Sequence, residues 1–435
     1  MRGIFNKADE ISRRNFMGTV AKTCLGVSIA PTLANAASPT FGDTGIVKRG
    51  AGIGTARSVI YLYMGGGMSH VDTLDPKEGN IPVAGNVKSI KTTADNVLLS
   101  EFMPNLARQM HHVCLFRGMS SSQGAHQQGR YFLHTSYAKR GTITHPEIGS
   151  WILKLGGRLN PTLPGNVRIG GGNNSGNGYF EPWTGALPIG NPKAGLQHAK
   201  RPDDVSDKQF EDRFELSREL NKAFVSRYTN REVQTYKTMY DDAFRLMESK
   251  DLQAFDILNE DEKSIEMYGD NSFGQGCLLA RRLVENNVRF VEVSHGGWDT
   301  HQNNMDRVEE RASIMDKALG ALLQDLNRRG LLESTLVVLS TEFGRTPKLT
   351  NGGDGRNHFP KAFSYLMAGG GIAGGQAYGK TDKDATNVLE GGCSITDFNA
   401  TMAYALGLPI DKILMSPSGR PFRIADKGKP VTSVF

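Results

Sequence analysis

The chain has 435 residues, 38% of them hydrophobic and 22% charged, so it is long enough to bury a large core and has the composition of a globular protein. Beyond the first residues, no apolar run reaches the roughly 20 residues that a helix needs to cross a bilayer, and we expect no membrane span in the mature chain. The net charge of +6 is not concentrated in any basic tract, which argues against a nucleic-acid partner.

The first 36 residues have the order of features of an export signal. Arg13 and Arg14 precede Phe16 and a mildly apolar stretch, which closes on the small residues Ala34 and Ala36. We therefore predict a twin-arginine signal peptide at 1–36 and a periplasmic or secreted mature protein, with the twin-arginine export machinery as its first partner. The segment holds five basic and two acidic residues, so the mature chain has 46 basic against 43 acidic residues and a net charge of +3.

Three cysteines remain after this cleavage, at Cys114, Cys277 and Cys393. Their number is odd and their spacing wide, so the sequence predicts no disulfide framework. One bridge with a free thiol left over stays open, because the periplasm is an oxidising compartment.

The first half of the chain alternates strand and helix patterns after a loose start. Residues 37–56 are rich in Gly, Thr and Ser and predict a flexible lead to a domain at 57–435. Short apolar runs predict buried strands, and amphipathic stretches between them predict helices. The strands are expected at 57–64 and 112–119 and the helices at 101–110 and 126–138.

The middle of the chain has a different character from its flanks. Residues 156–200 consist mainly of loop signals, and residues 203–268 are highly charged and helical. We predict a loop-rich and helical insertion at about 156–270, which would cover the substrate site as a lid.

The alternating pattern then resumes, with a helix at 274–287 and a strand at 288–294. A long apolar stripe beginning at Met315 predicts a further helix, which ends at Gly330. Strands are expected at 335–340 and 363–371. Apolar strands that alternate with helices predict an α/β fold, with a mostly parallel central sheet covered by helices on both faces.

Metal-ligand side chains follow several of these strands. Asp299 and His301 come after the strand at 288–294, Glu342 and Arg345 come after the strand at 335–340, and "GRNHFP" adds Arg356 and His358. Ligands bind beyond the carboxyl ends of parallel strands, and imidazoles with carboxylates are the ligands of hydrolytic metal ions. Arginines beside them would bind an anionic group.

Each of these motifs also has a purely structural interpretation. Asp299 and Thr300 suit the N-cap of the following helix, and Glu342 with Arg345 suits a salt bridge within a turn. His70, Asp72 and Asp75 follow the first strand, where the two aspartates suit a turn stabilised by their side chains. The sequence alone leaves these alternatives open.

Taken together, the motifs resemble one large bacterial family. "GGGMSHVDTLDPK", "FGQGCLLARRLVENNVRFVEVSHGGWDTH", "STEFGRTP" and "GRNHFPKAFSYLMAGGGIAGGQAYGKTD" are similar to segments of a domain-of-unknown-function family of twin-arginine-exported proteins. That family is placed in the alkaline phosphatase/sulfatase superfamily. The resemblance covers the chain from about Arg57 to near the C-terminus, and it implies an alkaline phosphatase/sulfatase-like fold.

The wider superfamily implies roles for individual residues. The position that resembles its nucleophile falls on His126, and serines including Ser122 lie just upstream. Asp299, His301 and His358 resemble metal ligands. Three departures weaken a two-metal site, because Gly65, Glu342 and Asn357 stand where the superfamily or the closer family has aspartate.

Two functions follow from these residues. In the first, Asp299, His301, Glu342 and His358 hold one divalent ion (zinc, manganese or calcium). Arg345 or Arg356 binds a small anionic ester, and His126 or Ser122 acts as base or nucleophile. The alternative is a non-catalytic protein on a degenerate hydrolase scaffold, which binds a surface polymer or takes part in assembly of the cell envelope.

Overall fold

The computed structural model describes residues 55–172, 175–197, 199, 204–227, 231–350 and 354–435. The predicted signal peptide and nearly all of the predicted lead therefore lie outside the described residues. The described part builds one nine-stranded sheet, in the order β12-β4-β11-β8-β1-β7-β5-β6, with β15 paired to β4. These strands are β1 Ser58–Met64, β4 Val113–Ser120, β5 Asn166–Ile169, β6 Leu187–Ile189, β7 Phe290–His295, β8 Thr335–Ser340, β11 Phe363–Ala368, β12 Gln376–Tyr378 and β15 Cys393–Ser394.

The centre of the sheet is parallel and in close register. β1 pairs with β7 on one side and with β8 on the other, so that Met64 lies opposite His295 and Tyr63 lies opposite Ser340. β11 runs antiparallel to both β4 and β8. The predicted α/β class with a mostly parallel sheet is thus confirmed, with β11 as the strand of opposite direction.

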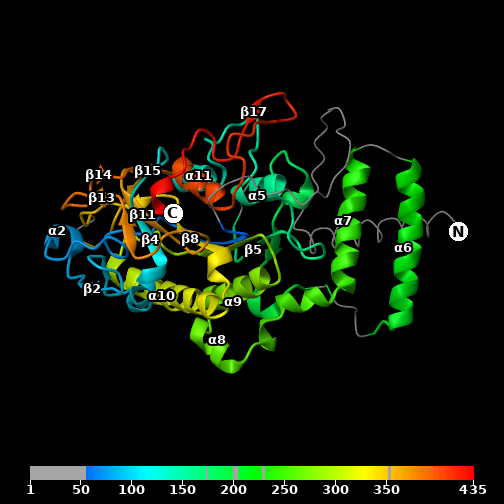
Figure 1. Cartoon of the computed structure of the whole chain (residues 1–435), viewed down its shortest axis with the longest axis horizontal. Helices are drawn as coiled ribbons and strands as arrows, with labels where there is room; N and C mark the ends of the chain where they lie inside the picture. The colour runs from blue at the N-terminus through cyan, green and yellow to red at the C-terminus, as the bar shows by residue number, and fades with distance from the viewer. Residues whose placement is uncertain (1–54, 173–174, 198, 200–203, 228–230, 351–353) are drawn as a thin grey trace.

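Helices cover both faces of this sheet (Figure 1). Successive side chains of β1 point to opposite faces, and they belong to two different hydrophobic cores. Ile60 and Leu62 face one core, and Val59 and Tyr61 face the other. The first core is closed by α3 Pro104–Gln109, α9 Ser272–Glu285 and α10 Asn304–Arg328, and the second by α4 His126–Thr135, α5 Ile148–Gly156 and α11 Ile395–Ala405.

Two strands lie inside the region that the sequence analysis assigns to loops. β5 and β6 pair with each other in parallel, and β5 extends the sheet beyond β7. They have only four and three residues and are flanked by glycines, so their apolar pattern is too short to stand out. The remaining strands form small ribbons: β2 Ser89–Lys91 with β3 Leu98–Ser100, β9 Gly344–Arg345 with β10 His358–Phe359, β13 Lys380–Thr381 with β14 Val388–Glu390, and β16 Leu414–Met415 with β17 Pro421–Phe422.

A helical hairpin stands beside the body of the molecule (Figure 1). It consists of α6 Asp207–Arg227 and α7 Arg231–Glu248, and α7 contacts the short helices at Pro182–Thr184 and Lys250–Phe255. Two further short helices are α2 Ile81–Ala84 and α8 Glu262–Tyr268. In the described part, no helix has both the length and the apolar character needed to cross a membrane.

The three cysteines of the described part are all buried and all free. Cys114 lies in β4, Cys277 in α9 and Cys393 in β15. The bridge that the sequence left open is therefore not formed in this structure.

Candidate functional site

The register of the sheet brings several loops to one edge. β1, β7 and β8 end side by side, so the segments after Met64, His295 and Ser340 meet there. β4 points the same way and leads into α4, whose first residue is His126. Because β11 runs in the opposite direction, the segment before it returns to this same edge and places His358 opposite Arg345 in the β9–β10 ribbon.

Three imidazoles converge on one carboxylate oxygen at this edge. The Nε2 atoms of His126, His301 and His358 lie 3.3 Å, 3.1 Å and 3.5 Å from Oδ1 of Asp299. The Nε2 atoms of His301 and His358 are 3.2 Å apart. We refer to these four residues as the His/Asp cluster. Ligand atoms of His126, Asp299 and His358 all lie within 4.8 Å of one another, which is close enough for one ion to touch them.

Each imidazole of the His/Asp cluster uses its other nitrogen for an oxygen acceptor. Nδ1 of His126 donates to Oε1 of Glu342 at 2.7 Å, and Nδ1 of His358 donates to the Gly124 carbonyl at 2.9 Å. Nδ1 of His301 lies 3.1 Å from the amide oxygen of Asn357. These acceptors place the ring proton on Nδ1, so the Nε2 lone pairs point toward the centre of the cluster.

Glu342 acts on the His/Asp cluster through His126. Its side chain is 2% exposed, and it also accepts from the Tyr63 hydroxyl at 3.0 Å and from the Gly66 amide at 3.0 Å. With both oxygens occupied in this way, Glu342 orients His126 from behind. The group of residues close enough to hold one ion contains His126, whereas Glu342, which the sequence suggested as a ligand, lies behind it.

The pKa values of three residues in the His/Asp cluster are shifted by burial and by neighbouring charged groups. Burial alone would raise the pKa of Asp299, but the adjacent Arg345 outweighs it and holds that pKa below its usual value. The hydrogen bond to Glu342 raises the pKa of His126 above 6.5, although burial opposes the shift. Burial lowers the pKa of His358, so this ring stays neutral near pH 7.

Gly66 makes the close approach of two of these loops achievable. Its φ is +119°, in the region that favours glycine, and a Cβ there would lie 2.5 Å from the amide nitrogen of Asp299. A glycine after β1 therefore lets the loop after β7 lie directly on it. This contact occupies the end of the first strand, where the sequence analysis noted glycine in place of the aspartate of the superfamily.

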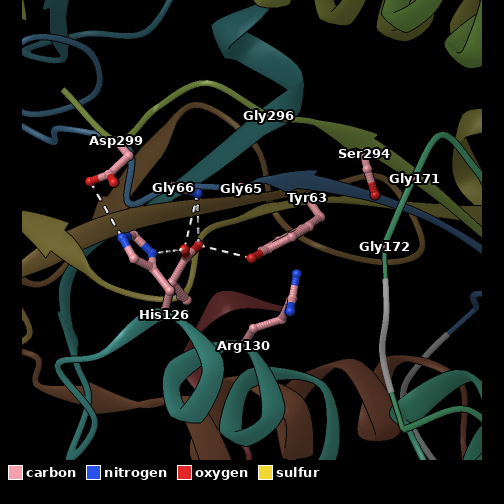
Figure 2. A pocket seen from close by; sticks show the side chains of 11 residues that line it. Tyr63, Gly65, Gly66, His126, Arg130, Gly171, Gly172, Ser294, Gly296 and Asp299 are labelled. Carbon is pink, nitrogen blue, oxygen red and sulfur yellow. Dashed lines mark hydrogen bonds and ion pairs between the residues drawn. The ribbon is translucent and has the colours of Figure 1, made fainter.

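A cavity of about 540 Å³ opens beside the His/Asp cluster (Figure 2). His126 and Asp299 lie at one side of it, and Ser294 lies at the other. Arg130 points into it from α4, one helical turn after His126. The sequence analysis missed Arg130, although its spacing of four residues from His126 places both on one face of a helix.

Three residues expected in the catalytic machinery have other surroundings. Arg356 is fully buried and binds both carboxylate oxygens of Asp72, so its guanidinium is enclosed in the body of the protein. Arg345 is also fully buried, and its nitrogens bind the carbonyls of Gly66, Gly67 and Arg356 as well as Asp299. The side chain of Ser122 is exposed and accepts from Gln123, outside the cavity lining. All five N–H donors of Arg356 and four of the five of Arg345 therefore bind groups of the protein itself.

The lid expected from the insertion is also corrected in part. Gly171 and Gly172, from the loop after β5, line the cavity, but no described residue of α6 or α7 does. The helical hairpin lies at the side of the molecule, where α7 contacts the short helices at Pro182–Thr184 and Lys250–Phe255.

The fold and the site define an α/β protein that gathers metal-type ligands at the carboxyl edge of a mostly parallel sheet. Residues 56–435 match the family described as "Protein of unknown function (DUF1501)", and the chain belongs to that family. The family part of the predicted resemblance is thereby confirmed. No curated protein matches the chain.

Several solved structures are similar to the chain over most of its length. The PsFucS1 sulfatase from Pseudoalteromonas sp. is 14% identical, with a TM-score of 0.41 over 86% of this chain and 73% of that one. A protein of the alkaline phosphatase superfamily from Vibrio parahaemolyticus is 11% identical, with a TM-score of 0.37 over 85% and 71%. The zinc complex of the periplasmic domain of EcEptC from Escherichia coli is 8% identical, with a TM-score of 0.37 over 86% and 87%. The strand order, rather than these likenesses, establishes the fold.

Proposed function

We propose that this protein is an exported, metal-dependent hydrolase of phosphate or sulfate esters. One divalent ion would be held by Nε2 of His126, His301 and His358 and by the carboxylate of Asp299. Compared with the set expected from the sequence, His126 replaces Glu342 as a ligand. Glu342 and Asn357 act behind the ligands as their hydrogen-bond acceptors.

The geometry of the Nε2 atoms is the observation that carries this proposal. A tetrahedral ion bound at roughly 2.0–2.1 Å has ligand atoms roughly 3.3–3.4 Å apart. Four of the six separations among the ligand atoms of the His/Asp cluster lie close to this value, between 3.1 and 3.5 Å. Nε2 of His126 is buried and has no hydrogen-bond partner among the described residues. A cation at the centre would satisfy it and separate the facing lone pairs of His301 and His358.

The composition of the His/Asp cluster favours zinc among the three ions considered. Three imidazoles and one carboxylate are the ligands that zinc takes with four neighbours. Calcium takes six to eight oxygen ligands, and the cluster offers one carboxylate. The hydrogen bonds to Nδ1 of each ring are the outer contacts that orient zinc-binding histidines.

The protein's own residues would then divide the work of hydrolysis. Bound here, the ion would supply a Lewis acid for the ester oxygen or an activated water. Asp299 is the ligand most open to the cavity, with 45% of its side chain exposed, and Arg345 fixes its orientation. The lining hydroxyls are those of Tyr63, which is committed to Glu342, and Ser294. We therefore propose direct attack by water rather than a covalent intermediate on serine.

Export by the twin-arginine route is part of the same proposal. Arg13, Arg14 and the small residues at Ala34 and Ala36 support it. The three free, buried cysteines agree with it, because a fold without disulfides can be completed before export. Replacing Arg13 and Arg14 by lysine should leave the protein uncut in the cytoplasm, and N-terminal sequencing of the periplasmic fraction tests this.

The experiment that tests the metal site is a zinc titration of the metal-free protein. Wild type should bind one ion per chain, and His301→Ala and His358→Ala should each bind far more weakly. His111→Ala is the matched control, because His111 is exposed and lies outside the His/Asp cluster. Hydrolysis of nitrophenyl phosphate and nitrophenyl sulfate should then require the bound ion.

The alternative function, a non-catalytic binding protein, is favoured by the residues at the nucleophile position. His126 stands where the helix after β4 begins, and Ser122 lies outside the cavity lining. A protein that binds zinc and an anionic polymer without cleaving either ester would be a binding protein on the same scaffold. That outcome of the titration and hydrolysis experiment would replace the hydrolase.

A further inference from the structure

Arg130 is the charged side chain of the cavity that lacks a partner. Its guanidinium forms no hydrogen bond and no ion pair with any described residue, and it is half-buried on α4. Figure 2 shows it directed into the cavity, on the side of Tyr63. An arginine held in this way has five donors available for a ligand.

The acidic groups around Arg130 are already neutralised by others. Arg168 binds Glu147, and Nε2 of His134 lies 3.3 Å from Glu292. At the His/Asp cluster, His126 contacts Glu342, and Arg345 contacts Asp299. No described carboxylate is therefore left to pair with Arg130, and its charge calls for an anion that comes from outside the chain.

Ser294 supplies a second polar group without a partner. It is the next-to-last residue of β7, and its Oγ is buried with no hydrogen-bond partner among the described residues. It lines the same cavity as Arg130, across from the His/Asp cluster. Buried hydroxyls are normally hydrogen-bonded, so an unpaired one at a cavity wall indicates a position where a ligand atom binds.

The rest of the wall is made of backbone. The other lining residues apart from Tyr63 and the groups already described are glycines, namely Gly65, Gly66, Gly171, Gly172 and Gly296. No described aliphatic side chain lines the cavity, whose size is that of a small-molecule site. Peptide groups exposed at such a wall can hydrogen-bond to the hydroxyls of a ligand.

We propose that Arg130 and Ser294 form an oxyanion subsite beside the His/Asp cluster, and that the ligand is a phosphate or sulfate ester of a polyhydroxylated alcohol. The two residues hold the oxyanion, and the glycine wall receives the alcohol. The oxyanion subsite stands on Arg130 and Ser294 alone, whereas the assignment of an ester as substrate rests on the proposed function. Figure 2 shows both side chains facing the same space.

The test is calorimetric binding of four probes to zinc-loaded protein: inorganic phosphate, inorganic sulfate, glycerol phosphate and phenyl phosphate. Arg130→Met should weaken oxyanion binding at least tenfold and Ser294→Ala several-fold. Arg130→Lys should fall between Arg130→Met and wild type, because lysine keeps the charge but loses the planar pair of donors. Arg140→Met is the matched control, because Arg140 is exposed and lies outside the cavity lining.

Zinc content and melting temperature are measured for every variant, so that misfolding is recognised separately. Glycerol phosphate should bind more tightly than phenyl phosphate, and comparison of the two inorganic ions identifies the oxyanion. Unchanged oxyanion binding in folded Arg130→Met would overturn the subsite while leaving the zinc site intact. Tighter binding of phenyl phosphate would overturn the polyhydroxylated ligand. Absence of zinc binding in wild type would instead refute the proposed function, and phosphate titration without metal would still test Arg130.

Discussion

Two arginine–aspartate pairs lie near the same edge of the sheet, and they differ in what surrounds them. Arg356 binds Asp72 through two nitrogens, and all of the groups are fully buried. Arg345 is equally buried, but its partner Asp299 is 45% exposed at the cavity. The sequence analysis assigned anion binding to either arginine, whereas the structure shows that their aspartate partners differ in exposure.

The pair around Asp72 is closed. The remaining donors of Arg356 reach the carbonyls of Val83, Thr346 and Pro347, and Asn304 donates to Asp72 at 3.0 Å. The pair around Asp299 is open, because three imidazole Nε2 atoms face its carboxylate. A buried polar network whose groups are satisfied holds a fold together, whereas converging lone pairs indicate a place for a ligand.

The largest effect on stability is expected from breaking the closed pair. Arg356→Met leaves the carboxylate of Asp72 buried without its counter-charge, which should lower the free energy of unfolding by about 3–5 kcal/mol. Urea unfolding of the metal-free protein measures it, with Arg140→Met as the surface control. A loss below about 1 kcal/mol would show that the pair is not the closed, structural one described here.

Substitution of a proposed zinc ligand beside Asp299 should change zinc affinity strongly and stability little. His358→Ala should lower zinc affinity by more than the roughly 10–100-fold typical of an outer contact, because it removes a ligand atom itself. The unfolding free energy of the metal-free protein should change by less than that of Arg356→Met. Competition with a chelating indicator measures the affinity, and an unaltered zinc affinity would remove His358 from the site.

A smaller effect is expected from the residue behind the ligands. Glu342→Gln keeps the shape of the side chain but weakens its hold on Nδ1 of His126, so zinc affinity should fall roughly 10–100-fold. Tyr63→Phe is the milder companion, because it removes a single hydrogen bond to Glu342. Equal effects of the two substitutions would contradict the orienting role of Glu342.

The smallest effect concerns pH. The contact with Glu342, together with the charge of Asp299, raises the pKa of His126 above 6.5, while burial and Arg345 oppose it. In metal-free protein, protonated His126 therefore stabilises the fold below pH 6.5, and this contribution is lost as pH rises through the raised pKa. Zinc needs the neutral ring, so its affinity should increase over that same rise. Glu342→Gln should move the midpoint down, and an unmoved midpoint would contradict this cause.

Much of the fold could be predicted from short apolar runs. The runs at β1 and β8 are buried on both faces, which is the pattern of central parallel strands. β5 and β6 could not be found, because three or four residues between glycines carry little periodicity. The direction of β11 was also hidden, since an apolar run does not reveal which way a strand points.

The sequence predicted which residue types form the candidate site, but it did not predict which side chains contact one another. Asp299, His301 and His358 stood out as ligand types after strands, and the structure brings them together. His126 joins them because the helix after β4 begins at this edge. The proposal of Arg130, in place of Arg345 or Arg356, as the anion-binding residue could not be foreseen, because it depends on which guanidinium meets a buried carboxylate.

Anomalous diffraction from crystals grown with zinc tests the central claim most directly. We predict one peak at the centre of the His/Asp cluster, at roughly 2.0–2.1 Å from Nε2 of His126, His301 and His358. The Nδ1 contacts to Glu342, Gly124 and Asn357 should be unchanged. A cluster that stays empty at saturating zinc, with its imidazoles joined only by hydrogen bonds, would contradict the account.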